Sequence, residues 1–269
     1  MEAAGSWQAA DPARLIATLR EHAADDALAE AGWKEVCARL DAERGSADDG
    51  LFRRAAIYAG AAGAVVAALK SNSTATLGRA LHATWALCRS SAGRQIVAKA
   101  GALDAVVDAM RAHSDAPAVQ EEGCAALASL MADATGATQR ALVAAGGLPV
   151  LVGAMRTHAA LPAVQDWACV ALFYLTNGGA ECVAAAQAAG AKECLLSAFH
   201  ARNPGEWKKL SCPGIGHAIS YLGMWASPGL AARWKLTELG EAKVATVDVA
   251  GVWALAAMEA LPDEEEGAL

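Results

Sequence analysis

The fold of this chain is decided by a stretch that occurs twice. Residues 100–113 read AGALDAVVDAMRAH and are followed by PAVQ at 117–120, while residues 145–158 read AGGLPVLVGAMRTH and are followed by PAVQ at 162–165. Gly101 pairs with Gly146 and Gln120 with Gln165, an offset of 45 residues in both cases. Less complete copies begin at residues 189–190, 62–63 and 31–32. A fixed period of this length indicates stacked units that share a continuous core.

Each unit predicts three helices. A short first helix over 138–145 ends at Gly146, because glycine adopts the left-handed conformation at little cost. A second helix over 148–157 has apolar residues three and four positions apart. The third helix spans 162–175 and starts at Pro162, whose missing N–H removes no hydrogen bond in the first turn. One such unit cannot cover its own apolar face, so neighbouring units must stack.

Composition supports helices and excludes several classes of protein. The chain has 269 residues, 55% of them hydrophobic, 5% aromatic, and a formal charge of −7. Alanine, which favours helix, is its commonest residue. The excess of acid argues against a nucleic-acid partner. Because no run of about 18 apolar residues occurs, we expect no membrane span.

The cysteines and the N-terminus bear on location. Seven cysteines are scattered with no C-x-x-C pair, which is typical of buried thiols in a reducing compartment. Residues 1–12 have no apolar run of the kind that a secretory signal requires. We therefore expect a cytoplasmic protein and leave its access to the nucleus open.

The quoted residues resemble those of a known family. The run A-G-[AG]-L-x-x-[VL]-V-x-A-M followed by P-A-V-Q-x-x-x-C-x-A-L-x-x-L resembles the armadillo (ARM) repeat, most clearly over residues 62–222. HEAT repeats are the nearest alternative, but a short first helix before Ala-Gly favours armadillo. The resemblance implies an all-α, right-handed solenoid of about six units with degenerate ends. It also implies a concave groove, lined by third helices, that binds a partner protein or an extended peptide.

We expect a single repeat domain over residues 1–261. Asp11 and Pro12 predict the cap and first residue of a helix that runs to about His22. Residues 241–261 predict one long closing helix, since an array needs an end cap. The acidic tail 262–269 is expected to be disordered and solvated.

The candidate groove residues come from the resemblance. In armadillo proteins that bind nuclear-localisation peptides, the third helix carries a Trp and, four residues later, an Asn. This chain has Trp85 but places Arg89 where the Asn would be. Matching the other units, with Trp85 aligned to Ala125, completes a candidate partner-binding groove: Trp85, Arg89, Ser129, Tyr174, His217 and Tyr221. The missing Asn ladder argues against a nuclear-import receptor, and the two tyrosines have the alternative of being half-buried ends of the core.

Residues 202–234 interrupt the repeat with several prolines and glycines. Three tryptophans lie there, Trp207, Trp225 and Trp234. They are candidate exposed anchors for a partner, because a large apolar patch on a soluble protein often marks an interaction site. The alternative is that they fill gaps where the superhelix tapers.

The sequence argues against catalysis. His113 and His158 recur because the repeat recurs, and equivalent residues about 8 to 10 Å apart cannot share one metal ion. We expect them at helix ends, where they interact favourably with the helix dipole. Cys212 lies near His217 but has no evident orienting residue. No phosphate-binding loop or nucleophile elbow occurs, so we expect no enzyme, cofactor, metal or small-molecule substrate.

The sequence thus favours a non-catalytic protein–protein interaction scaffold or adaptor that binds through its groove. One alternative is a structural subunit of a larger assembly, which would use its ends or outer helices. A more distant alternative is an enzyme regulatory subunit.

Overall fold

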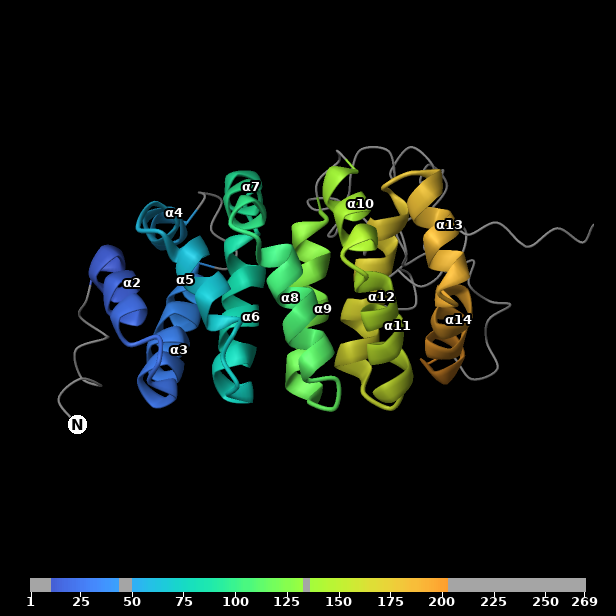
Figure 1. Cartoon of the computed structure of the whole chain (residues 1–269), viewed down its shortest axis with the longest axis horizontal. Helices are drawn as coiled ribbons and strands as arrows, with labels where there is room; N and C mark the ends of the chain where they lie inside the picture. The colour runs from blue at the N-terminus through green and yellow to red at the C-terminus, as the bar shows by residue number, and fades with distance from the viewer. Residues whose placement is uncertain (1–10, 44–49, 133–135, 203–269) are drawn as a thin grey trace, which may run out of the picture.

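A computed structural model describes residues 11–43, 50–132 and 136–202. These residues form helices and connecting turns, with no strand in the described ranges, so the predicted all-α class is confirmed. The helices follow one another along the long axis of the molecule, from α2 at one end to α14 at the other (Figure 1). The closing helix predicted over 241–261 and the tail 262–269 lie outside the described residues.

The helices fall into three classes by their place in the unit. The first helices are α4 (Leu51–Tyr58), α7 (Ser91–Lys99), α10 (Ala137–Ala144) and α13 (Ala180–Ala188). The second helices are α2 (Pro12–Glu21), α5 (Ala61–Ala68), α8 (Ala102–Ala112), α11 (Gly147–Thr157) and α14 (Ala191–Arg202). The third helices are α3 (Asp26–Ala42), α6 (Thr74–Leu87), α9 (Pro117–Leu130) and α12 (Pro162–Thr176). The described chain therefore holds complete units α4–α6, α7–α9 and α10–α12, flanked by α2–α3 and α13–α14, with the first helices along one edge (Figure 1).

The predicted helix boundaries are confirmed where local chemistry determines them. Gly101 and Gly146 precede α8 and α11 with φ angles of 85° and 70°, in the left-handed region. Pro117 and Pro162 are the first residues of α9 and α12. The Asp11 carboxylate accepts a hydrogen bond from the backbone N–H of Arg14 at 2.8 Å and so caps α2.

Two shorter copies of the repeat were placed incorrectly by the sequence. The left-handed glycine before α5 is Gly60, with φ of 87°, whereas Gly63 lies inside that helix. Gly32 lies buried in the middle of α3 and starts no unit. An Ala-Gly pair also occurs inside helices, where Gly63 is exposed and Gly32 is buried. The pair marks a turn only where the rest of the repeat accompanies it.

A buried glutamine joins the second helix to the third in two successive units. Gln120 Nε2 donates to the carbonyls of Met110 at 2.9 Å and His113 at 2.8 Å. Gln165 Nε2 donates to Met155 and His158 at 2.9 and 3.1 Å. These carbonyls lie at the C-terminal ends of α8 and α11, where no intrahelical donor is available. The glutamine side chains therefore supply a donor to the carbonyls of Met110 and Met155. The carbonyls of His113 and His158 also accept the backbone N–H groups of Ala116 and Leu161.

The third helices pack one against the next, α3 on α6, α6 on α9 and α9 on α12. Ala83, Ala126 and Ala171 occupy matching positions in α6, α9 and α12 and are fully buried. Larger side chains around them form one core cluster that runs through the described units. The alanine-rich composition thus permits close helix contacts along the array.

The units are also joined through helix ends. His113 and His158 are the C-cap residues of α8 and α11, which confirms their predicted place at helix ends. His158 Nε2 is hydrogen-bonded to the carbonyl of Ser114 at 2.9 Å. The Arg111 guanidinium donates to the carbonyl of Ala145 at 3.3 Å. Each contact links one unit to the following one.

Among the described residues no single helix is long and apolar enough to cross a membrane. Two pairs of consecutive helices, α4 with α5 and α10 with α11, have the length and composition of a span when each pair is taken together. The bends between their helices are 77° and 76°.

Candidate functional site

The predicted groove residues have different environments. Trp85 and Ser129 are half-buried on α6 and α9, and Arg89 is half-buried just beyond α6. Tyr174 on α12 is only 8% exposed and packs against Phe173 with ring centroids 5.5 Å apart. Burial raises the pKa of Tyr174 to about 12. Tyr174 therefore belongs to the core and offers little surface to a partner, as the alternative reading of the sequence allowed.

The remaining candidates lie outside the described residues. They are His217 and Tyr221 of the groove and the three possible anchors Trp207, Trp225 and Trp234.

The structure changes the register in which the third helices are compared. Their N-cap residues are Ser73, Ala116 and Leu161, so 43 residues separate the first two and 45 the next two. Counted from its cap, Trp85 matches Ala128 and not the Ala125 with which the sequence pairs it. The two alignments of Trp85 differ because the connections between units differ in length.

Aromatic side chains from two units meet on the third helices. The rings of Trp85 on α6 and Trp167 on α12 lie with centroids 6.1 Å apart at 70°, although α9 packs between these helices. His82 lies 5.2 Å from the Trp85 ring, and the Arg89 guanidinium carbon lies 5.8 Å from it. We call the surface formed by these residues and the carboxylates described next the third-helix face.

His82 connects three successive third helices. Its Nε2 lies 3.1 Å from a carboxylate oxygen of Asp41 on α3, and its Nδ1 lies 3.1 Å from a carboxylate oxygen of Glu122 on α9. The pKa of His82 is raised, mainly by the hydrogen bond to Glu122, with burial opposing the shift. Because carboxylates only accept hydrogen bonds, the ring donates to both helices when both of its nitrogens carry a proton.

Further carboxylates lie along the same face. The pKa of Glu121 is raised, first by burial and then by the negative charges of Glu122 and Asp166. Glu121 and Glu122 belong to α9 and Asp166 to α12. Acidic groups from α3, α9 and α12 are therefore linked on this face, Asp41 and Glu122 through His82, and Glu121 through the charges of Glu122 and Asp166.

Sequence reasoning missed His82, Trp167 and the carboxylates around them. Counted from the caps, His82 matches Ala125 and Val170, so no histidine recurs at this position of the repeat. Trp167 was a visible signal, since it is, like Trp85, a tryptophan on a third helix. It was overlooked because the sequence comparison followed the position of Trp85.

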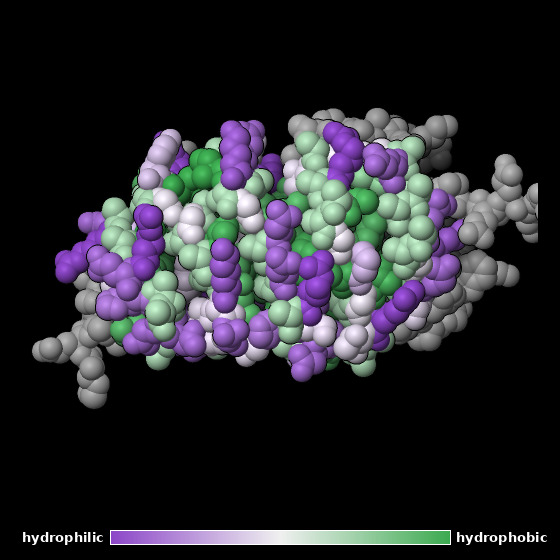
Figure 2. Space-filling view, viewed as in Figure 1, coloured by the Kyte–Doolittle hydropathy of each residue, from purple (hydrophilic) through white to green (hydrophobic). Residues whose placement is uncertain are grey.

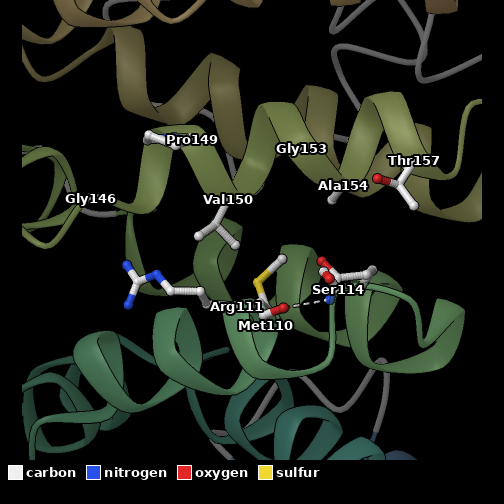
Figure 3. A pocket seen from close by; sticks show the side chains of 10 residues that line it. Met110, Arg111, Ser114, Gly146, Pro149, Val150, Gly153, Ala154 and Thr157 are labelled. Carbon is white, nitrogen blue, oxygen red and sulfur yellow. Dashed lines mark hydrogen bonds between the residues drawn. The ribbon is translucent and has the colours of Figure 1, made fainter.

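A second concave region lies on the other helices of the units. A pocket of about 440 Å³ opens between α8 and α11, and Figure 3 shows Met110, Val150 and Pro149 around it with Arg111, Ser114 and Thr157 at its polar positions. Gln120, which also lines this pocket, donates to the Met110 carbonyl at 2.9 Å. On the face seen in Figure 2, hydrophilic residues stand apart and divide a weakly hydrophobic surface.

The described residues contain no group of three or more His, Cys, Asp or Glu side chains that could hold a metal ion. The six described cysteines are buried free thiols, and burial raises the pKa of Cys37 and of Cys88 to about 12. Such thiols stay protonated and are poor nucleophiles. Cys212 and His217 lie outside the described residues.

Comparison with known proteins gives the fold. No protein-family model and no curated protein matches the chain. Among solved structures, the designed armadillo repeat protein YIII(Dq)4CqI is 19% identical with a TM-score of 0.62, over 94% of this chain and all of that one. A designed armadillo repeat protein in complex with the peptide (KR)4 is 18% identical with a TM-score of 0.59, over 94% and 100% of the two chains. Computationally designed armadillo repeat proteins for modular peptide recognition are 19% identical with a TM-score of 0.61 and the same coverage. The chain therefore has an armadillo-like repeat fold.

Proposed function

We propose that this chain is a non-catalytic interaction scaffold whose third-helix face binds an extended segment of a partner protein that carries lysine or arginine side chains. The observation that carries the proposal is the packing of Trp85 against Trp167 beside the Asp41–His82–Glu122 bridge. In an armadillo-like superhelix this face would line the concave groove.

Charge and aromatic character both support a cationic ligand. Carboxylates on α3, α9 and α12 attract positive groups. Tryptophan rings bind ammonium and guanidinium groups over their faces. Arg89 already holds its guanidinium against Trp85, so the ring accepts a cation in this setting. A structural neighbour with designed armadillo repeats holds a (KR)4 peptide, which suits the same choice of ligand.

The test is the affinity for a (KR)4 peptide with blocked termini, measured by fluorescence anisotropy. Trp167→Ala is expected to weaken binding about fivefold or more, because it removes the ring partner of Trp85 and a cation-binding surface. Asp166→Asn is expected to weaken binding to a smaller extent, since it removes one negative charge from the face.

The matched control is Asp104→Asn, which removes an equal charge from an exposed position of α8. It should leave the affinity within about twofold of wild type, because screening limits the effect of distant exposed charges. A wild-type chain that fails to bind (KR)4, or an equal loss in Asp104→Asn and Asp166→Asn, would overturn the proposal. Circular dichroism of each variant confirms that helix content is retained.

A further inference from the structure

The third-helix face contains a histidine that two carboxylates share. His82 is 18% exposed at its side chain, Asp41 is 37% exposed and Glu122 is 28% exposed. Each carboxylate places both of its oxygens 3.1 to 3.2 Å from one ring nitrogen. The ring therefore occupies the position between α3 and α9 that a ligand cation would need in order to reach these same oxygens.

The helices packed on α6 are α3, α5, α7, α8 and α9, and they differ in the charged groups that they carry. Helix α3 contributes Asp41 and an ion pair between Arg39 and Glu35 at 2.8 Å, and α9 contributes Glu121 and Glu122. Helix α5 has no titratable residue, Arg94 of α7 donates to the carbonyl of Cys88, and Asp108 of α8 pairs with Arg111. On α6 itself the other charged residue is Arg79, which is exposed. The groups in direct contact with the ring nitrogens are thus both acidic.

Loss of the ring proton changes what the carboxylates can do. A neutral imidazole has one N–H, so it can donate to Asp41 or to Glu122 but not to both. The other carboxylate then loses its hydrogen bond to the ring and the attraction of the ring's positive charge. It becomes available to a lysine or arginine side chain that lies along the face.

We infer that the His82 proton and a cationic side chain of the ligand compete for the carboxylates of Asp41 and Glu122, so that binding at the third-helix face strengthens as pH rises. The inference rests on the proposed function, because it assumes a cationic ligand at this face. By linkage the bound ligand must in turn favour the neutral form of His82.

The experiment measures the affinity of the terminally blocked (KR)4 peptide between about pH 6 and about pH 8.5, where histidine titrates and the lysines of the peptide do not. The wild-type chain should bind about fivefold or more tightly at the upper end. His82→Gln cannot gain a proton, so its affinity should stay constant and close to the wild-type value at high pH. His113→Gln, at the end of α8, is the matched control and should keep the wild-type pH dependence.

The outcomes separate the two proposals. Binding by the wild-type chain that does not change with pH, or a pH dependence that persists in His82→Gln, overturns the inference alone. Absence of binding at every pH overturns the proposed function and the inference with it. Nuclear magnetic resonance adds a direct readout, because the ligand should lower the pKa of the His82 ring, and an unchanged or raised value would contradict the competition.

Discussion

The seam between second and third helices repeats itself, whereas the third-helix face does not. Gln120 and Gln165 make the same pair of hydrogen bonds in successive units. His82, by contrast, matches Ala125 and Val170 when each is counted from its cap. Identical residues recur where the same backbone carbonyls accept a hydrogen bond in two successive units. Residues that occur once on the same framework are therefore the better candidates for a specific function.

The largest loss of stability is expected from Gln120→Ala, which changes the contact between a second and a third helix. Gln120 is 1% exposed, and its loss removes the donor that it supplies to the Met110 carbonyl, while the His113 carbonyl keeps the backbone N–H of Ala116. We expect the free energy of unfolding to fall by about 2 to 3 kcal/mol, measured by urea denaturation. Gln95→Ala on the exposed side of α7 is the control and should change it by less than about 0.5 kcal/mol. Equal effects of the two changes would show that the seam carries no special stability.

A smaller effect is expected from Gly123→Ala, which tests packing at the same seam. A Cβ atom at Gly123 would lie 2.5 Å from Cγ of Met110, so the methionine must move. Ala80 and Ala168 occupy the matching positions in the flanking units, which shows that the fold itself accepts a methyl group there. We expect a loss of about 1 to 2 kcal/mol in thermal or urea unfolding. A stabilised variant would mean that Met110 has room to repack.

The face is tested by comparing wild type with His82→Gln at several pH values. The pKa of His82 is raised in the folded chain, so its contribution to stability is complete below the pKa of the unfolded chain and is lost as pH rises through the folded value. The substitution should therefore cost about 1 kcal/mol near pH 6 and clearly less near pH 9. Urea denaturation at both pH values checks this. A cost that grows with pH would contradict the assigned protonation.

The smallest effect is expected at the contact between Arg111 and the Ala145 carbonyl, which we call the outer link between two units. Arg111→Ala removes the bond to the Ala145 carbonyl and the ion pair with Asp108, whose partners are 52% and 72% exposed. Because solvent screens such groups, the loss should stay below about 1 kcal/mol. Thermal unfolding at low and high salt would show it. A loss as large as that of Gln120→Ala would make the outer link part of the stabilising framework.

The sequence predicted the architecture because repetition and local chemistry act together. Gly146 and Pro162 determine where helices begin through backbone conformation alone, and both boundaries were confirmed. The prediction that copies of the repeat begin at residues 31–32 and 62–63 was wrong, because an Ala-Gly pair also fits a helix interior.

The site was harder to predict than the fold. The contact between Trp85 and Trp167 joins two third helices that are separated by another third helix, α9. A periodic sequence pattern does not encode which side chains reach past a whole unit. The bridge through His82 depends on the geometry of three helices at once. Such contacts depend on the curvature of the array, which the connection lengths alter and the repeat consensus does not record.

The Trp85–Trp167 contact also affects how the array comes apart. Solenoids are usually described by the stability of each unit plus a term for each adjacent pair, so that a boundary between folded and unfolded segments can fall at any interface. Here a boundary on either side of α9 breaks the contact between α6 and α12 in addition to the local interface. That added penalty disfavours partly unfolded arrays, and the units from α4 to α12 should melt as one cooperative block.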